Sequence, residues 1–257
     1  MSDSHILYAV QEGIATLTLR RPDKKNALTV EMYDQLVEGL AQASADDAVR
    51  VILWRAEGNV FTSGNDIKDF MNAPPAGVDS PVFRLLLALV DLEKPLVAAV
   101  RGPAIGIGTT ALLHCDLVYC SDNARLQMPF VNLGLCPEGA SSMLFPHLAG
   151  LQKASEWLLF GEAFTAEEAL RFGLCNAVFP DASFDEAVQE RVARLAAKPA
   201  SSLRATKALL RGPMRESIRE TMMKEGEVFI ERLGSPEAIE AFTAFLEKRA
   251  PDFSRFR

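Results

Sequence analysis

The chain has 257 residues, of which 49% are hydrophobic, and a formal net charge of −7. This length fits one large domain, or a domain with a helical appendage, and the acidic balance gives no electrostatic footprint for nucleic acid. Because the apolar runs are too short for a membrane span and the four cysteines have no metal-ligand or secreted-disulfide pattern, we expect a soluble, cytoplasmic protein with no nucleic-acid or membrane partner.

The N-terminal part alternates between strand and helix signals. Ile6, Tyr8 and Val10 stand at every second position, Glu12 and Gly13 mark a turn, and residues 14–19 alternate again, which together predict a β-hairpin. Thr29 is a suitable N-cap for the amphipathic helix that follows, and residues 49–54 predict the next strand. This order of elements is a ββα unit.

The same order returns in the middle of the chain. A loop that ends in FTSGND, residues 61–66, leads into a short helix, and residues 82–92 predict another helix. The apolar run 96–100 predicts a buried strand that enters a glycine turn, after which we expect a helix from Ile107 to Cys115. Two further strands are predicted over residues 117–120 and 125–128.

From Gly139 onward almost every segment predicts helix. Thr165 with Glu168, and Ser183 with Glu186, have the spacing of capping boxes, and Ser235 precedes a proline at the first helical position. We therefore predict an α/β fold in which residues 1–195 form a spiral core of ββα units and residues 196–257 form a C-terminal helical region.

The glycine turn before Ile107 has three interpretations. The pattern Gly106-x-Gly108-x-x-Ala111 after a strand matches a dinucleotide fingerprint, with Asp122 as a ribose ligand, which would indicate an NAD-dependent oxidoreductase. Against this, only about eight residues separate the glycines from the next strand, too few for a βαβ crossover. The glycines could instead let a helix pack on a strand, or bring free N–H groups at the helix start to an anionic ligand.

Glu138 is the carboxylate that we expect to carry chemistry. It lies between Pro137 and Gly139, and its other sequence neighbours are mostly apolar. Burial in such surroundings raises the proton affinity of a carboxylate and makes it a better base. The alternative from the residues alone is a solvated loop carboxylate with no chemical role.

Four segments along the chain together resemble the crotonase, or enoyl-CoA hydratase/isomerase, superfamily. They are RPDKKNALT (21–29), FTSGNDIKDF (61–70), KPLVAAVRGPAIGIG (94–108) and AFLEKRAPDF (244–253). The resemblance implies a crotonase-like spiral of ββα turns with a C-terminal helical region that forms trimers or hexamers. It implies an acyl-CoA thioester as substrate and no separate cofactor, since coenzyme A is part of the substrate. It also implies an oxyanion hole, in which the backbone N–H groups of Asn65 and Ile107 bind the thioester oxygen.

Within this superfamily the chain departs from the hydratases at both positions of their catalytic glutamates. Thr110 and Phe130 stand there, which disfavours an enzyme that must orient and deprotonate a water molecule. The segment MPFVNLGLCPEGASS (128–142) instead resembles the peroxisomal-type 3-enoyl-CoA to trans-2-enoyl-CoA isomerases, whose single catalytic glutamate matches Glu138. This implies an enzyme of fatty-acid β-oxidation that carries a proton from C2 to C4. A hydratase-like enzyme and a non-catalytic acyl-CoA-binding protein are the alternatives.

The resemblance also suggests substrate contacts. Lys24, Lys25 and Lys68 are candidates for the phosphates of coenzyme A, although a single lysine is more often a solvated surface charge. Phe130 could line the acyl chain together with Phe70 and Met71, or could belong to the core. The remaining expected contacts are Ala27, Ser63, Gly64, Asp66, Ile67 and Gly106.

Overall fold

The computed structural model describes residues 4–77 and 79–256. It contains a six-stranded sheet in the order β1-β2-β3-β4-β6-β9 and a three-stranded sheet in the order β5-β7-β8. β1 and β2 are antiparallel, as the predicted hairpin requires, and the later neighbours in the large sheet are parallel. The strands are β1 (Ile6–Gln11), β2 (Ile14–Leu19), β3 (Val51–Ala56), β4 (Leu96–Val100), β5 (Pro103–Ile105), β6 (Leu117–Ser121), β7 (Arg125–Gln127), β8 (Phe164–Thr165) and β9 (Ala177–Phe179).

Helices connect the strands and make up the C-terminal part of the described chain. The α-helices are α1 (Val30–Ala45), α2 (Ile67–Asn72), α3 (Pro81–Asp91), α4 (Ile107–Thr110), α5 (Ser141–Ala149), α6 (Leu151–Phe160), α7 (Ala166–Arg171), α8 (Phe184–Ala196), α9 (Ala200–Arg211), α10 (Arg215–Leu233) and α11 (Pro236–Glu247). The 3₁₀ turns are η1 (Pro22–Lys24), η2 (Ala111–His114), η3 (Val131–Leu133), η4 (Asp181–Ser183) and η5 (Gly212–Met214). Among the described residues, none of these helices combines the length and the apolar character needed to cross a membrane.

The parallel strands are almost wholly apolar because helices cover both faces of the large sheet. Side chains alternate between the two faces along each strand. Ile52 and Trp54 of β3 belong to the main core, which they share with apolar side chains of α1 and α3. Val51 and Leu53 point to the other face, where they pack with the apolar side of α8. The sheet is therefore the middle layer of the molecule.

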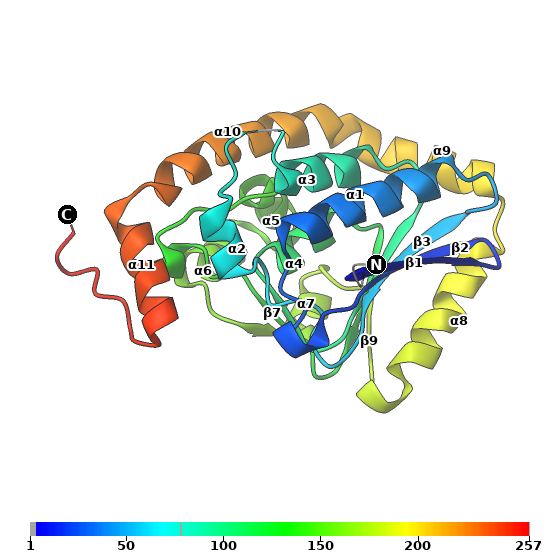
Figure 1. Cartoon of the computed structure of the whole chain (residues 1–257). Helices are drawn as coiled ribbons and strands as arrows, with labels where there is room; N and C mark the ends of the chain where they lie inside the picture. Colours follow the sequence, from blue (N-terminus) through cyan, green and yellow to red (C-terminus); the bar gives the residue numbers. More distant parts are fainter. Residues whose placement is uncertain (1–3, 78, 257) are drawn as a thin grey trace.

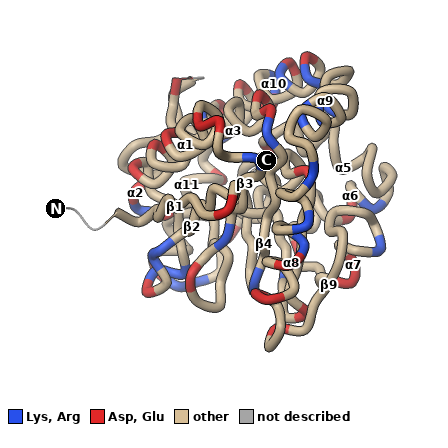
Figure 2. The backbone as a smooth tube through the Cα atoms, turned by 90° about the vertical axis from the view of Figure 1, so that its right-hand side faces the viewer, with Lys and Arg blue, Asp and Glu red and all other residues tan. Residues whose placement is uncertain are grey.

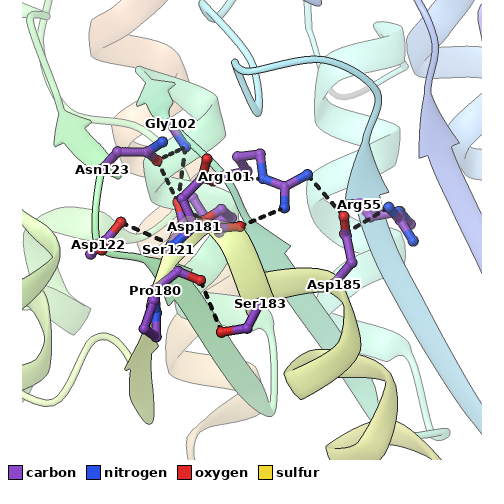
Figure 3. Close-up of polar contacts among 11 residues, drawn as sticks. Arg55, Arg101, Gly102, Ser121, Asp122, Asn123, Pro180, Asp181, Ser183 and Asp185 are labelled. Atoms are coloured by element: carbon purple, nitrogen blue, oxygen red, sulfur yellow. Dashed lines mark hydrogen bonds and ion pairs between the residues drawn. The ribbon is translucent and has the colours of Figure 1, made fainter.

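An ion-pair network adds polar contacts between α8 and the sheet (Figure 3). Arg101, directly after β4, contacts Asp181 at 2.8 Å and Asp185 at 3.0 Å, and Arg55 of β3 contacts Asp185 at 2.9 Å. Asp122, the ribose ligand of the oxidoreductase hypothesis, lies in the same region and accepts a hydrogen bond from the Asp181 N–H at 3.2 Å. Its carboxylate therefore holds the chain before α8.

Most of the predicted helix caps are present. Thr29, Thr165 and Ser235 each accept a hydrogen bond from the N–H three residues further on, and Glu168 completes the capping box at Thr165. The capping box predicted at Ser183 is wrong, because Ser183 ends the turn η4 and its hydroxyl donates to the Pro180 carbonyl at 3.4 Å.

The prediction of almost continuous helix after Gly139 is wrong at β8 and β9. These strands have two and three residues, too few to show an alternating pattern, yet β9 completes the large sheet by pairing with β6. The helix predicted from Ile107 to Cys115 is also wrong, since α4 has four residues and the 3₁₀ turn η2 follows it. The connection between the parallel neighbours β4 and β6 thus contains β5 of the second sheet and these two short turns of helix, and not the single helix that follows a dinucleotide fingerprint, which weighs against the oxidoreductase interpretation.

The last two helices reach back to the middle of the chain (Figure 1). α10 contacts α3 and α5, and α11 contacts both α10 and η3. Through these contacts the C-terminal helices lie beside the loop that carries Glu138, which directly follows η3 in the sequence.

Candidate active site

Glu138 lies at the end of the loop between η3 and α5. The next two residues, Gly139 and Ala140, both have left-handed backbone conformations, with φ of 70° and 57°. They turn the chain sharply into α5, and the Ser141 N–H donates to the Glu138 carbonyl at 3.2 Å. The turn leaves the Glu138 side chain buried, with only 8% of its surface exposed.

The Glu138 carboxyl has one hydrogen-bonded oxygen and one free oxygen. The Thr110 hydroxyl, in α4, donates to Oε1, and Oε2 is buried with no partner among the described residues. Burial raises the pKa of Glu138 from 4.5 to about 8, while the Thr110 hydrogen bond lowers this pKa and the charge of Glu225 raises it. The carboxyl can therefore gain and lose a proton close to neutral pH.

Two backbone N–H groups are free on loops that lie side by side. Thr62 and Ala104 form an isolated bridge between these loops, and Gly64 fits because a Cβ there would lie 3.0 Å from the Ile105 carbonyl oxygen. Within residues 4–77 and 79–256, the N–H groups of Asn65 and Ile107 have no protein acceptor. Such paired donors can bind a carbonyl oxygen that gains negative charge.

Tyr33 links the Asn65 loop to the carboxyl group. Its hydroxyl donates to the Asn65 side-chain oxygen, which fixes the side chain that follows the Gly64 turn. Burial, and then the charge of Glu138, raises the pKa of Tyr33 well above its ordinary value. The Glu138 carboxyl is therefore close enough to act electrostatically on the residue that orients Asn65.

A pocket of about 770 Å³ opens beside these groups. Asn65 and all ten predicted substrate contacts line it: Lys24, Lys25, Ala27, Ser63, Gly64, Asp66, Ile67, Lys68, Gly106 and Phe130. Ile107 and Glu138 are not lining residues, although Gly106, directly before Ile107, and Leu135, three residues before Glu138, are. The structure thus brings the predicted contacts together around one cavity, and the Glu138 carboxyl is hydrogen-bonded to Thr110 in the short helix that follows Gly106.

The pocket has a basic side. Arg21, Lys24, Lys25 and Lys68 line it, and Figure 2 shows a group of basic positions close to β1 and β2. Arg21 is paired with Asp66 at 2.8 Å, and the Asp66 carboxylate also accepts a hydrogen bond from the Asp69 N–H at the start of α2. The Arg21 charge is thus partly neutralised, and the three lysines contribute most of the positive charge available to an anionic ligand.

The other side of the pocket is aromatic. Phe229 of α10 makes edge contacts with both Phe70 and Phe130, each with ring centroids 6.4 Å apart, and Phe242 of α11 makes a tilted contact with Phe70 at 6.3 Å. We call these four residues the aromatic wall. Met71, a predicted acyl contact, is half-exposed and is not among the lining residues. An apolar chain can therefore lie on the aromatic wall, but not on Met71.

Several functional residues are missing from the sequence prediction. Thr110 is noted there only as the replacement of a hydratase glutamate, whereas its hydroxyl holds Glu138 in the structure. Phe229 and Phe242 fall on the apolar faces of predicted helices, but periodicity shows only that such residues are buried, and not where. Tyr33 gives no signal of its role beyond its place in an amphipathic helix.

The fold and the site define a protein family. The family model described as enoyl-CoA hydratase/isomerase matches residues 9–255, and the chain belongs to this family. The crystal structure of an enoyl-CoA hydratase/isomerase from Pseudoalteromonas atlantica T6c is 40% identical and superposes with a TM-score of 0.92, over 97% of this chain and 100% of that one. The crotonase fold implied by the four segments is therefore confirmed.

Among the relatives, two isomerases are similar over nearly the whole chain. Enoyl-CoA delta isomerase 2 of Homo sapiens is 38% identical over 93% of this chain, and this chain spans 62% of that protein's length. The peroxisomal enoyl-CoA delta isomerase 3 of Mus musculus is 34% identical over 95% of this chain and 79% of its own length. The predicted resemblance to the peroxisomal-type isomerase branch is confirmed at the level of sequence similarity.

Proposed function

We propose that this protein is an enoyl-CoA isomerase that converts 3-enoyl-CoA to trans-2-enoyl-CoA, with Glu138 as its single proton carrier. The observation that carries the proposal is the buried Glu138 carboxyl, held at one oxygen by Thr110 and free at the other, with its pKa raised to about 8. A group with this proton affinity can both take and return a proton near neutral pH. The similarity to enoyl-CoA delta isomerases supports the same function.

The proposed reaction moves one proton and changes no oxidation state. Glu138 takes a proton from C2, and the negative charge moves to the thioester oxygen as a dienolate forms over C1 to C4. Glu138 then delivers the proton to C4, and the C3=C4 double bond becomes a C2=C3 double bond. Because the proton is returned, the proposal includes no cofactor, oxidant or reductant.

The developing charge needs stabilisation while the proton is on Glu138. In this proposal the N–H groups of Asn65 and Ile107 bind the thioester oxygen, and their lack of an acceptor within the described part of the chain supports this role. The lysines on the basic side bind the phosphates of coenzyme A, and the aromatic wall receives the acyl chain. A place in fatty-acid β-oxidation follows from this substrate class.

A hydratase is the alternative that the site supports least. Hydration needs a second group to handle the water molecule, and Phe130 occupies the position of the second hydratase glutamate. The other carboxylate that acts on Glu138 is Glu225, and both of its oxygens accept backbone hydrogen bonds from Ala140 and Ser142. Glu225 is therefore engaged with the backbone rather than available to a water molecule.

Assembly into a trimer or hexamer is part of the proposal. Leu209 and Leu210 on α9 are 79% and 73% exposed, which is unusual for adjacent leucines on a helix surface. On α6, Leu151, Leu159 and Phe160 are also exposed. Apolar surfaces of this kind support contact with further copies of the chain.

The test of the proposed function follows 3-enoyl-CoA, 2-enoyl-CoA and 3-hydroxyacyl-CoA by chromatography. The wild type should isomerise faster than it hydrates, and Glu138→Gln should lose about 10²–10⁴-fold in isomerase kcat with little change in acyl-CoA affinity. Glu227→Gln, an exposed position on α10, is the matched control. Near wild-type isomerisation by Glu138→Gln, or hydration that exceeds isomerisation, would contradict the proposal. Acyl-CoA binding without isomerisation or exchange of the α-proton would indicate a binding protein.

A further inference from the structure

The backbone turn after Glu138 is strained at one residue. Gly139 adopts its left-handed conformation freely, but Ala140 has φ of 57° and ψ of 20°. The left-handed backbone conformation is unfavourable for a residue with a Cβ atom, and such a residue keeps this conformation only where surrounding contacts hold it. Ala140 is fully buried. The direction of the Glu138 side chain therefore depends on whatever holds Ala140 in place.

Glu225 supplies that hold from α10. Its Oε2 accepts the Ala140 N–H at 2.6 Å, and its Oε1 accepts the Ser142 N–H at 2.8 Å. Ala140 is the N-cap residue of α5 and has no side chain that could cap the helix. A carboxylate 85 residues further along the chain thus caps α5 and fixes the turn that begins at Glu138.

Glu225 also places a negative charge next to Glu138 when it is ionised: burial raises the pKa of Glu225, and the hydrogen bonds from Ser142 and Ala140 oppose this by favouring its ionised carboxylate. Burial is the largest cause of the raised pKa of Glu138. The Thr110 hydrogen bond lowers this pKa, and the charge of Glu225 raises it. The other titratable groups in contact with this region are Tyr33, Cys136 and His114, and a ring nitrogen of His114 is hydrogen-bonded to the Gly139 carbonyl at 2.8 Å. Burial raises the pKa of Tyr33 and that of Cys136, the latter to about 11, and it lowers the pKa of His114 to about 4, so none of the three carries charge near neutral pH. Glu225 is therefore the charged neighbour that acts on Glu138.

We propose that Glu225 is a positioning residue of the active site, which holds the turn from Glu138 to Ser142 in its left-handed conformation and strengthens Glu138 as a base. This inference rests on the proposed function. A neutral N-cap could satisfy the same N–H groups by hydrogen bonding alone. The carboxylate of Glu225 does so while adding charge beside Glu138, and these two effects can be separated by experiment.

Glu225→Gln removes the charge and keeps the shape of the side chain. Glu138 must be ionised to accept the C2 proton, so the acid limb of the kcat/KM profile should move to lower pH in this variant. The kcat should fall up to about 10²-fold, because a small displacement of a catalytic group is costly, and acyl-CoA affinity should stay close to that of the wild type. Glu227→Gln, exposed on the same helix, should change neither quantity.

Two more variants separate geometry from charge. Glu225→Asp keeps the charge but shortens the side chain, so it should keep the acid limb near its wild-type position while kcat falls. Ala140→Gly in the Glu225→Gln background removes the backbone strain, so it should recover part of kcat while the acid limb stays at lower pH. If Glu225→Gln lowers only the melting temperature and leaves the acid limb in place, Glu225 is merely a helix cap and the inference is overturned.

A readout without turnover distinguishes this inference from the proposed function. The infrared carboxyl band of Glu138, assigned from its loss in Glu138→Gln, titrates whether or not the enzyme isomerises. Its midpoint should fall in Glu225→Gln, even if the wild type proves to have no isomerase activity. An unchanged midpoint in both Glu225→Gln and the double variant with Ala140→Gly would overturn the electrostatic role.

Discussion

Ionisation of Glu138 should lower the free energy of unfolding at high pH, and the Glu138→Gln variant should not show this loss of stability. In the unfolded chain the carboxyl loses its proton near its ordinary pKa of 4.5, whereas in the native protein it keeps the proton up to about pH 8. Below the lower value both states are protonated and the group has no effect. Between the two values ionisation favours the unfolded chain, so the wild type loses stability as the pH rises through this window.

The size of the effect follows from the two pKa values. At about 1.4 kcal/mol for each pH unit, a pKa of about 8 in place of 4.5 lowers the free energy of unfolding by about 5 kcal/mol at most once Glu138 is ionised. Glu138→Gln has no such ionisation, and Thr110 can still donate to the amide oxygen. The variant should therefore gain stability relative to the wild type as the pH rises.

Urea denaturation of the wild type and of Glu138→Gln, at about pH 5 and about pH 9, measures this difference. Other titrating groups are common to both proteins and cancel in the comparison. The exposed Glu227→Gln should show the same pH dependence as the wild type. A stability difference between Glu138→Gln and the wild type that is equal at both pH values would refute the reasoning, since it would mean that the Glu138 carboxyl is not desolvated in the native state.

Three further predictions concern the groups around the pocket and the surface. Thr110→Val removes a hydrogen bond that lowers the pKa of Glu138, so the acid limb of kcat/KM should move to higher pH, as measured by pH-dependent isomerase kinetics. Gly64→Ala places a Cβ 3.0 Å from the Ile105 carbonyl oxygen at a positive φ, so kcat should fall by up to about 10²–10³-fold, the effect of losing one oxyanion donor, in the same assay. A double change of Leu209 and Leu210 to lysine should reduce the mass measured by light scattering, whereas a wild type that is already monomeric at micromolar concentration would contradict the proposed assembly.

The elements that could be predicted from the sequence are those whose signal is local. The hairpin has two apolar strands of six residues, β1 and β2, on either side of a Glu-Gly turn, and Thr29, Thr165 and Ser235 cap their helices with their own side chains. β9 could not be found this way, because three residues do not define a period and its place depends on pairing with β6. The Ser183 box failed because the turn η4 runs directly into α8, so that Ser183 has φ of −113° and ψ of 8° instead of the extended conformation of an N-cap residue.

The residues of the candidate site likewise fall into those with a local sequence signal and those that depend on contacts between distant segments. The loops that carry Asn65 and Glu138 are continuous stretches of sequence, so a family resemblance could identify them. The contacts that tune Glu138 join distant segments, since Thr110 and Glu138 are 28 positions apart in the sequence and Glu225 is 83 to 85 positions from the turn that it holds. Nothing in a single sequence relates such pairs, since periodicity shows which face of a helix is buried but not what it meets.

The pocket takes its walls from both ends of the chain. Arg21 and Lys24 follow the first hairpin, whereas Phe242, Phe245 and Leu246 lie on α11. A ribosome makes the chain from its N-terminus at about 5–20 residues per second, so the basic side of the pocket is synthesised well before the helix that faces it. A nascent chain accordingly has no closed acyl pocket until α11 has emerged and docked, and substrate can stabilise only a chain that has already finished folding.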